Sequence, residues 1–266
     1  MKIGVVGAAG CIGGAISYGM EKLGHDVIPH DITMDTSLSD LVDCEIAYIC
    51  VPTPELPDGG CDTMIVESVI SGLDAHGFTG IIAIKSTIVP GTTEKLIKKY
   101  SKETICFVPE FLRERHAISD FTENHNICVI GTLDRFVFEI IKESHGHYPQ
   151  EFIQMSPTEA ELAKYFSNVF NAMRVVFACG FESVCNKLGA DYTKIKNAMV
   201  KRPTIENLYL DCNEKFRGFA GMCLTKDTAA FRKLAESLGV DAQIFRTIVE
   251  DNKLYTPTVF PNMRLK

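Results

Sequence analysis

The amino-terminal half of the chain alternates short apolar runs with helical patterns. The runs are continuously apolar, which is typical of parallel strands that are buried on both faces. Strands are predicted at 2–6, 26–30, 45–51, 80–85, 104–108, 126–130 and 151–154, and helices at 13–23, 64–76, 92–99 and 134–144. This order predicts an α/β fold, a doubly wound and mostly parallel sheet that binds ligands beyond the carboxyl ends of its strands.

One long helix is predicted from Ser156 to about Gly189. Ser156 can cap its start, Pro157 suits the first helical position and Glu159 completes a capping box. Gly189 can take the left-handed conformation that ends helices. An apolar stripe recurs along the helix at three- and four-residue steps: Leu162, Phe166, Val169, Phe170, Met173, Phe177, Val184 and Leu188. A polar stripe of Lys164, Asn168 and Asn171 accompanies it, and on spacing alone such a stripe is a solvated face.

Further helices are predicted at 191–200, 228–238 and 242–252, followed by a tail from 255 to 266 that lies along the surface or frays. We therefore expect two domains. Residues 1–153 form the sheet domain, and residues 154–266 form a smaller all-helical domain around the long helix.

A glycine-rich turn follows the first strand, with Gly7, Gly10 and Gly13 before the first helix. Gly7 and Gly10 let the backbone approach a pyrophosphate at the helix amino terminus, and Gly13 lets helix and strand pack closely. Asp31, at the end of the second strand, is placed to accept hydrogen bonds from a ribose diol, which favours NAD over NADP. A tight turn without a ligand is the alternative, but the position between strand and helix favours a Rossmann-like NAD domain.

Composition narrows the class further. The 266 residues are 46% hydrophobic and 23% charged, as in ordinary soluble enzymes. A net charge of −7 argues against sequence-independent binding of nucleic acid. No apolar run is long enough to span a membrane and no signal-peptide layout is present, so a cytoplasmic protein is expected. The 10 cysteines are scattered without a CxxC pair, which predicts buried thiols in a reducing compartment rather than a disulfide scaffold or a metal site.

Four segments together resemble the UDP-glucose/GDP-mannose dehydrogenase family: 85–93 (KSTIVPGTT), 109–114 (PEFLRE), 161–168 (ELAKYFSN) and 218–228 (GFAGMCLTKDT). The segments 50–54 (CVPTP), 117–121 (AISDF) and 189–191 (GAD) are also similar, and the likeness runs in the family's order from residue 1 to about 255. It implies a nucleotide-sugar 6-dehydrogenase, with UDP-glucose as the default substrate, that oxidises a primary alcohol to a carboxylate with two NAD⁺. This chemistry serves polysaccharide biosynthesis.

By this resemblance Cys223 is the nucleophile, which adds to an aldehyde to give a thiohemiacetal and then a thioester that water hydrolyses. Lys164 and Asn168 match the family's KxxxN pair and, one helical turn apart, can face one developing oxyanion. Read without the family, a cysteine among ten is usually an inert thiol.

The remaining site residues also follow from the resemblance. Either Glu110 or Glu114 could act as base or orient water, although a pair of loop carboxylates is the simpler interpretation without the family. Thr87 and Asp227 match positions that hold water and position the lysine. The implied cofactor contacts are Gly7, Gly10, Cys11, Ile12, Gly13, Asp31, Val51, Pro52, Thr53, Ser86, Thr87 and Lys226. The implied substrate contacts are Phe111, Leu112, Arg113, Glu114, Lys164, Asn168, Tyr209 and Gly221.

The sequence departs from the family's pattern at several positions. Ala220 and Thr225 replace a glycine and a proline around the cysteine, Arg115 replaces a glycine, and Cys179-Gly180 replaces an asparagine and a glutamate. An arginine that the family supplies across its dimer has no match, and the chain ends where the family's second nucleotide-binding-like domain would begin. These departures bear on the identity of the substrate more than on the identity of the cofactor.

Two other functions remain open at this point. A two-electron 3-hydroxyacid dehydrogenase would use the Lys-xxx-Asn pair and needs no cysteine, and a non-catalytic NAD-binding subunit would need a partner chain. The long helix also predicts a homodimer through its apolar face, since a helix of about 48 Å exceeds what one small domain usually covers. Burial of this face against 191–252 in the same chain is the alternative.

Overall fold

The computed structural model describes residues 1–215, 217–221 and 223–256. The chain forms two compact units. Unit 1 consists of Met1–Pro54 and Asp62–Lys164, and unit 2 consists of Glu55–Cys61 and Tyr165–Lys266. The loop 55–61 therefore belongs with the helical unit, although it lies between strands of unit 1 in the sequence.

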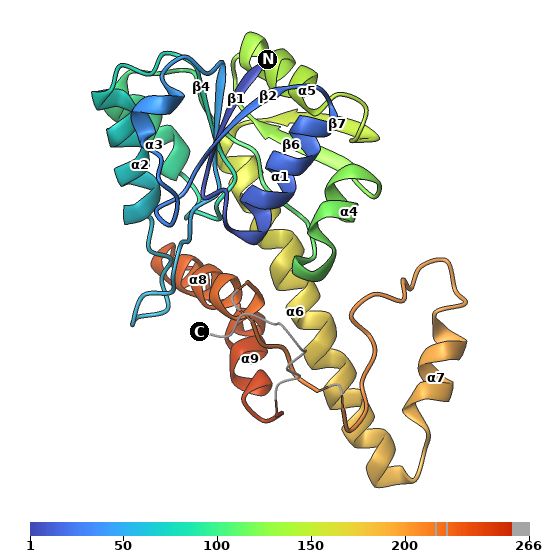
Figure 1. The fold of residues 1–266 in the computed structure, drawn as a ribbon. Helices are drawn as coiled ribbons and strands as arrows, with labels where there is room; N and C mark the ends of the chain where they lie inside the picture. The colour runs from blue at the N-terminus through green and yellow to red at the C-terminus, as the bar shows by residue number, and fades with distance from the viewer. Residues whose placement is uncertain (216, 222, 257–266) are drawn as a thin grey trace. The chain divides into compact units, whose positions relative to one another are not determined.

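Unit 1 is built on a seven-stranded sheet in the order β2-β1-β3-β4-β5-β6-β7 (Figure 1). Its strands are β1 Lys2–Val6, β2 Asp26–His30, β3 Ile46–Ile49, β4 Ile81–Ile84, β5 Ile105–Phe107, β6 Ile127–Gly131 and β7 Glu151–Met155. Every neighbouring pair is parallel except β5 and β6, which meet antiparallel at Phe107 and Gly131. The predicted doubly wound, mostly parallel sheet is confirmed, because the continuous apolar runs became strands that are covered on both faces.

Helices cover the two faces of this sheet (Figure 1). One face packs against α1 Cys11–Lys22, α4 Ala117–Thr122 and α5 Arg135–His145. The other packs against α2 Met64–Ala75, α3 Thr92–Tyr100, the 3-10 helix Leu38–Leu41 and the first turns of α6. A second 3-10 helix, Glu114–His116, precedes α4, which the apolar pattern had not predicted because it is only 6 residues long.

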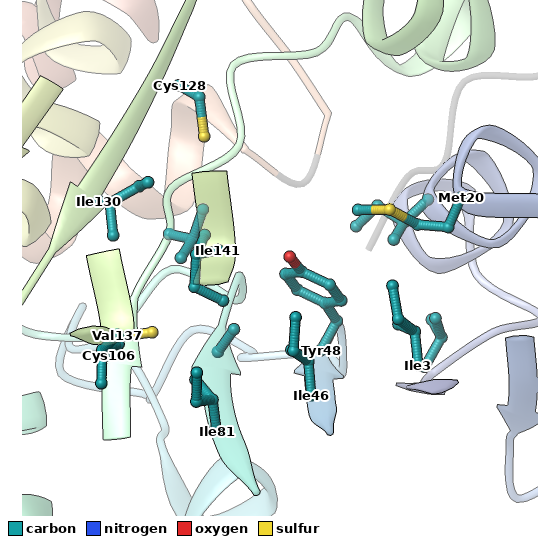
Figure 2. Packing of buried hydrophobic residues seen from close by; sticks show 14 of the residues in the cluster. Ile3, Met20, Ile46, Tyr48, Ile81, Cys106, Cys128, Ile130, Val137 and Ile141 are labelled. Carbon is teal, nitrogen blue, oxygen red and sulfur yellow. The ribbon is translucent and has the colours of Figure 1, made fainter. Parts of the chain in front are cut away.

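Buried side chains from adjacent strands form the core on the α1 face. Figure 2 shows Ile3, Ile46 and Ile81 pointing to the same side of the sheet as Tyr48, toward Met20 and Ile141. The Tyr48 ring is fully buried, and its hydroxyl lies 2.6 Å from Ser144 Oγ. The buried hydroxyl of Tyr48 thus has a hydrogen-bond partner within this largely apolar core.

Unit 2 contains most of the long helix α6 Pro157–Leu188, together with α7 Tyr192–Met199, α8 Leu224–Ser237 and α9 Gln243–Asn252. Two small apolar clusters hold it together. One joins α6 to Phe219 and Ile248, and the other joins α6 to Tyr192 and Cys212. No helix among the described residues is long and apolar enough to cross a membrane.

The boundaries of α6 agree with the sequence signals. The backbone N–H of Ser156 donates to Glu159 Oε2 at 2.8 Å, the Glu159 N–H donates back to Ser156 Oγ at 3.3 Å, and Gly189 has a φ of +68°. The predicted capping box and left-handed end are confirmed. By contrast, α8 begins at Leu224, four residues before the predicted start at 228. The predicted surface tail falls mostly on 257–266, which lie outside the described residues.

Glu161, in the second turn of α6, caps another helix. Its fully buried carboxylate accepts hydrogen bonds from the backbone N–H of Gly91 and, at 2.8 Å, from the N–H of Thr93. The Thr93 hydroxyl donates to the same carboxylate at 2.6 Å. Burial raises the pKa of Glu161, and these three donors partly offset that effect. Glu161 thus serves as the amino-terminal cap of α3 and fixes the start of α6 to unit 1.

We expect Glu161→Ala to destabilise unit 1 by about 2–4 kcal/mol, because the backbone N–H groups of the N-cap Gly91 and of Thr93 lose their buried acceptor. Amide hydrogen exchange of residues 92–96 is the measurement, and exchange should accelerate there first. Glu161→Gln is the matched control, since its amide oxygen still accepts from Thr93 and should lose about half as much or less. Equal protection of α3 in the alanine variant and the unaltered protein would contradict the capping role.

Candidate active site

The turn between β1 and α1 has room for backbone only. Gly7 has a φ of +85°, and a Cβ there would lie 2.5 Å from the carbonyl O of Cys50. A Cβ at Gly13 would lie 2.1 Å from the carbonyl O of Gly7. Gly10 is the N-cap of α1, and Cys11 and Ile12 begin the first turn of this helix. The backbone N–H groups at a helix amino terminus are suited to a pyrophosphate.

Asp31 lies directly after β2, beside this turn. Its carboxylate accepts from the N–H of Ala9 at 3.2 Å, the N–H of Thr33 at 3.0 Å and the Thr33 hydroxyl at 2.8 Å. The hydrogen bonds from Thr33, together with that from Ala9, lower the pKa of Asp31. An ionised acceptor at this position fits the hydroxyl donors of a ribose. The residues present therefore fit a bound dinucleotide.

The ends of β3 and β4 lie next to each other. The Ser86 hydroxyl donates to the carbonyl O of Val51 at 2.7 Å, and the Lys85 N–H donates to the carbonyl O of Ile49 at 2.9 Å. Four predicted cofactor contacts are thereby gathered at the carboxyl edge of the sheet: Val51, Pro52, Thr53 and Ser86. Thr87 follows Ser86 and is half-buried.

A buried ion pair lies behind the PEFLRE segment. Lys85 Nζ lies 3.1 Å from Glu110 Oε2, and the two side chains are only 1% and 6% exposed. The Phe111 N–H donates to the other carboxylate oxygen of Glu110 at 2.9 Å. Burial, the largest single effect, would lower the pKa of Lys85, but Glu110 together with the nearby Cys128 and Cys50 outweighs it and the pKa is raised. Lys85 was not among the site residues predicted from the sequence and stood only in the KSTIVPGTT segment, although a lysine at the end of an apolar strand was a signal.

Lys164 reaches the same segment from α6. Its ammonium donates to the main-chain carbonyl O of Glu110 and lies 5.7 Å from the centroid of the Phe111 ring. Lys164 is half-buried, so it belongs to this contact rather than to a solvated stripe. The PEFLRE main chain and Lys164 therefore hold each other in place.

Asp120 fixes the rest of the PEFLRE segment through Arg113. The sequence placed Asp120 in the AISDF segment but did not indicate it as a site residue. Arg113 Nε and Nη2 donate to the two oxygens of Asp120 at 2.9 and 2.6 Å, and the Arg113 N–H donates at 3.0 Å. These contacts with Arg113 lower the pKa of Asp120. Leu112 packs against the core, whereas Glu114 is exposed and its carbonyl O accepts from the Cys11 thiol at 3.2 Å. The PEFLRE segment thus contacts the glycine turn.

Unit 2 carries a separate polar cluster around Asp227. This fully buried carboxylate accepts from Asn168 Nδ2 at 2.5 Å and pairs with Lys226 Nζ at 2.7 Å. Lys226 Nζ also lies 3.8 Å from Cys61 Sγ, a thiol of the loop 55–61 that the sequence did not indicate. Asn168 and Lys226 were predicted for substrate and cofactor, and here both are held by Asp227.

Cys223 occupies the N-cap position of α8 and is exposed. All 10 cysteines lie within the described residues; seven of them are buried, and Cys223 is the exposed one. Its carbonyl O accepts from the Asp227 N–H at 2.9 Å, which ties the thiol's residue to the Asp227 cluster. Gly221, two residues earlier, has a φ of +88° and lets the chain turn into the helix.

Tyr209 lies in the segment between α7 and α8 and is half-buried. Its φ of +60° places a bulky residue in the left-handed region, which costs about 1 kcal/mol or more. Strain of this kind is concentrated at functional sites, and it is the structural feature that singles out Tyr209.

The sheet, the glycine turn and Asp31 define an NAD-binding oxidoreductase of the Rossmann type. Comparison with known families narrows this class: residues 32–148 match the NAD binding domain of the UDP-glucose/GDP-mannose dehydrogenase family, and residues 158–254 match its central domain. The chain belongs to this family.

Individual relatives agree with the family. The UDP-glucose 6-dehydrogenase TuaD of Bacillus subtilis is 31% identical over 79% of this chain and 46% of its own length. The UDP-glucose 6-dehydrogenase AglM of Haloferax volcanii is 25% identical over 95% of this chain and 69% of its own length. The structure of a UDP-glucose dehydrogenase from Pyrobaculum islandicum superposes with a TM-score of 0.87 and 27% identity, covering 95% of this chain and 68% of that one. The chain thus spans about half of TuaD and two thirds of the others.

We expect Glu110→Gln to destabilise unit 1 by about 3–5 kcal/mol, because the Lys85 ammonium would remain buried without a counter-charge. The double variant Lys85→Met with Glu110→Gln should recover most of this loss, since it contains no buried charge. Urea unfolding of the two single variants and the double variant measures the coupling. Additive losses would contradict a direct buried ion pair.

Proposed function

We propose that the chain oxidises the primary alcohol of a nucleotide sugar, UDP-glucose by default, to the carboxylate with NAD⁺. The observation that carries this proposal is Cys223, an exposed thiol at the start of a 14-residue helix beside the buried Asp227. A thiol is superfluous for an alcohol–ketone interconversion, whereas an aldehyde needs a nucleophile before a second hydride can leave. The proposal rests on this chemistry together with membership of the family.

The dinucleotide would be held by the residues of unit 1. Gly7, Gly10 and Gly13, with the N–H groups of Cys11 and Ile12, would receive the pyrophosphate. Asp31 would accept hydrogen bonds from the ribose hydroxyls, and Ser86 and Thr87 would line the far end of the cofactor at the strand edge. Two NAD⁺, bound one after the other, would each accept one hydride of the four-electron oxidation.

Cys223 has the central role among the residues of unit 2. Its sulfur attacks the aldehyde carbon, a C–S bond forms, and the carbonyl electron pair moves to oxygen. The amino end of α8 favours negative charge on the attacking sulfur. After the second oxidation the resulting thioester is cleaved by water, which releases the carboxylate and returns the thiol.

Lys164 and Asn168 are one turn apart on α6 and are proposed to stabilise the oxyanion. Asp227 serves as a positioning residue, because its carboxylate fixes the Asn168 amide and the Lys226 ammonium. Between the two glutamates, the exposed Glu114 is the better candidate for the base that activates water. Glu110 is the better candidate for a positioning role, since its carboxylate is already paired with Lys85.

We expect Cys223→Ala to reduce carboxylate formation about 10³-fold or more, while NAD binding stays within about twofold, because the thiol acts in the chemistry and not in the cofactor site. Product stoichiometry with UDP-glucose and NAD⁺ is the measurement: two NADH per acid in the unaltered protein. Cys185→Ala, which removes a buried thiol at the far end of α6, is the matched control and should remain active.

Other results would assign the protein differently. Unchanged acid formation by Cys223→Ala would exclude the thioester route. One NADH per turnover with a hydroxyacid would indicate two-electron chemistry with the Lys-xxx-Asn pair. Binding of NAD without turnover of any nucleotide sugar would indicate a non-catalytic subunit that needs a partner chain.

We also propose that α6 pairs with a second copy of this chain. The predicted apolar stripe divides in two: Val169 is buried, whereas Phe166 and Phe177 are 74% and 59% exposed. Phe166 stacks on Phe170 with ring centroids 6.0 Å apart, and Phe177 lies 5.8 Å from Phe181. Exposed aromatic pairs in a row on one helix are characteristic of a buried interface.

The double substitution Phe166→Ser with Phe177→Ser should convert a dimer into a monomer, because it removes two large apolar contacts from the proposed interface. Sedimentation velocity at micromolar concentration distinguishes the two states. Leu238→Ser, at the carboxyl end of α8, removes a side chain that is 68% exposed elsewhere and should leave the dimer intact. A monomeric unaltered protein, or a dimer that survives the double substitution, would contradict the interface.

A further inference from the structure

Unit 2 contains a second pair of thiols that the proposed reaction does not use. Cys179 lies on α6, and Cys212 lies in the segment between α7 and α8. Their sulfur atoms are 3.5 Å apart, and the two residues are 1% and 4% exposed. The pair packs with Tyr192 and Cys185 in one small apolar cluster. Residues 33 positions apart in the sequence have therefore been brought to sulfur–sulfur contact.

The surroundings make the two thiols unequal. Cys212 donates its S–H to Cys179, and the Gly218 N–H donates to the same Cys179 sulfur at 3.2 Å. The Cys212 hydrogen bond, the Gly218 hydrogen bond and the nearby Arg217 lower the pKa of Cys179 against the effect of burial. The same contact and burial raise the pKa of Cys212. These contacts favour the thiolate at Cys179 and the protonated thiol at Cys212.

Arg217 is itself fixed in this position. Its Nη2 donates to Glu182 Oε2 at 2.8 Å and to Ser183 Oγ at 2.7 Å, both on the turn of α6 that follows Cys179. The guanidinium is thus held near the thiol pair by two independent contacts. A backbone donor and a second thiol at one sulfur, with a nearby cation that Glu182 partly offsets, are features of a reactive cysteine rather than of an inert buried one.

We propose that Cys179 and Cys212 are a redox-active dithiol, a modification site at which a peroxide forms a reversible disulfide. The Cys179 thiolate attacks one peroxide oxygen, the O–O bond breaks, and with a proton the departing oxygen leaves as water. Cys179 is then a sulfenic acid. The Cys212 sulfur attacks the Cys179 sulfur, the S–O bond breaks, and the oxygen leaves as a second water with the Cys212 proton. The two sulfurs lose two electrons, and the peroxide gains them.

Cys50 and Cys128, which lie in unit 1, lack these features. Burial raises the pKa of Cys50 and of Cys128 to about 12, which suppresses their thiolates. A peroxide can reach the Cys179–Cys212 pair by local opening, because the described part of 200–223 contains no helix or strand. The disulfide would fasten this segment, which carries Tyr209 and leads to Cys223, to α6.

The test uses the full chain with Cys223→Ser, so that the exposed thiol does not consume the oxidant. Protein is treated with a slight excess of hydrogen peroxide, free thiols are alkylated, and the peptides are mapped by mass spectrometry. We expect a peptide pair joined through Cys179 and Cys212 that dithiothreitol separates, and a Tm about 3–8 °C above that of the reduced protein.

Matched variants identify the partners. Cys185→Ser, in the same cluster, should still form the crosslink. Cys212→Ser should abolish it and leave a Cys179 sulfenic acid that dimedone traps. Should Cys212→Ser fail to fold, the peptide map of the protein with native Cys212 decides alone. A Cys179 that stays reduced, proceeds to the sulfinic acid or pairs with a different cysteine in that map would overturn the proposal.

Discussion

The buried ion pair of Lys85 and Glu110 is the constraint on which the site in unit 1 depends. Removing two charges from water is expensive, so the pair persists only because its geometry is close and a backbone N–H occupies the other carboxylate oxygen. The hydrogen bond from the Phe111 N–H to Glu110 also fixes the main chain that follows β5. The carbonyl O of Glu110 accepts from Lys164, so one buried pair helps to set the position of the Lys164 ammonium.

Asp227 has the corresponding part in unit 2, again as a fully buried carboxylate with two polar partners. It holds Asn168 and Lys226, and its own N–H is bound to the carbonyl O of Cys223. The helix α6 is common to both arrangements, since Lys164 belongs to unit 1 and Asn168 to unit 2. Lys164 is therefore held by the main-chain carbonyl O of Glu110 in unit 1, and Asn168 is held by the carboxylate of Asp227 in unit 2.

Local pattern was sufficient for the sheet, for α6 with both its ends and for the glycine turn, because periodicity and capping act over a few residues. The partners of the site residues were not accessible in this way. Glu161 reaches α3 across 68 positions of sequence to Thr93, and Lys85 meets Glu110 from another strand end. The sequence hint was a charged residue in or directly after an apolar pattern, which indicates a buried partner without identifying it. The start of α8 was missed because its polar first turn, Thr225 to Asp227, resembles a loop.

The cysteines illustrate how surroundings decide chemistry when residue type does not. Desolvation alone suppresses the thiolates of Cys50 and Cys128, and a backbone donor with a second thiol reverses that effect at Cys179. Cys223 differs from all of them through exposure and a helix amino terminus. Because Cys212 and Cys223 lie at either side of the same loop before α8, a crosslink at the first restrains the chain that presents the second. Thiol oxidation and thiol catalysis in unit 2 would then involve the same segment of the chain.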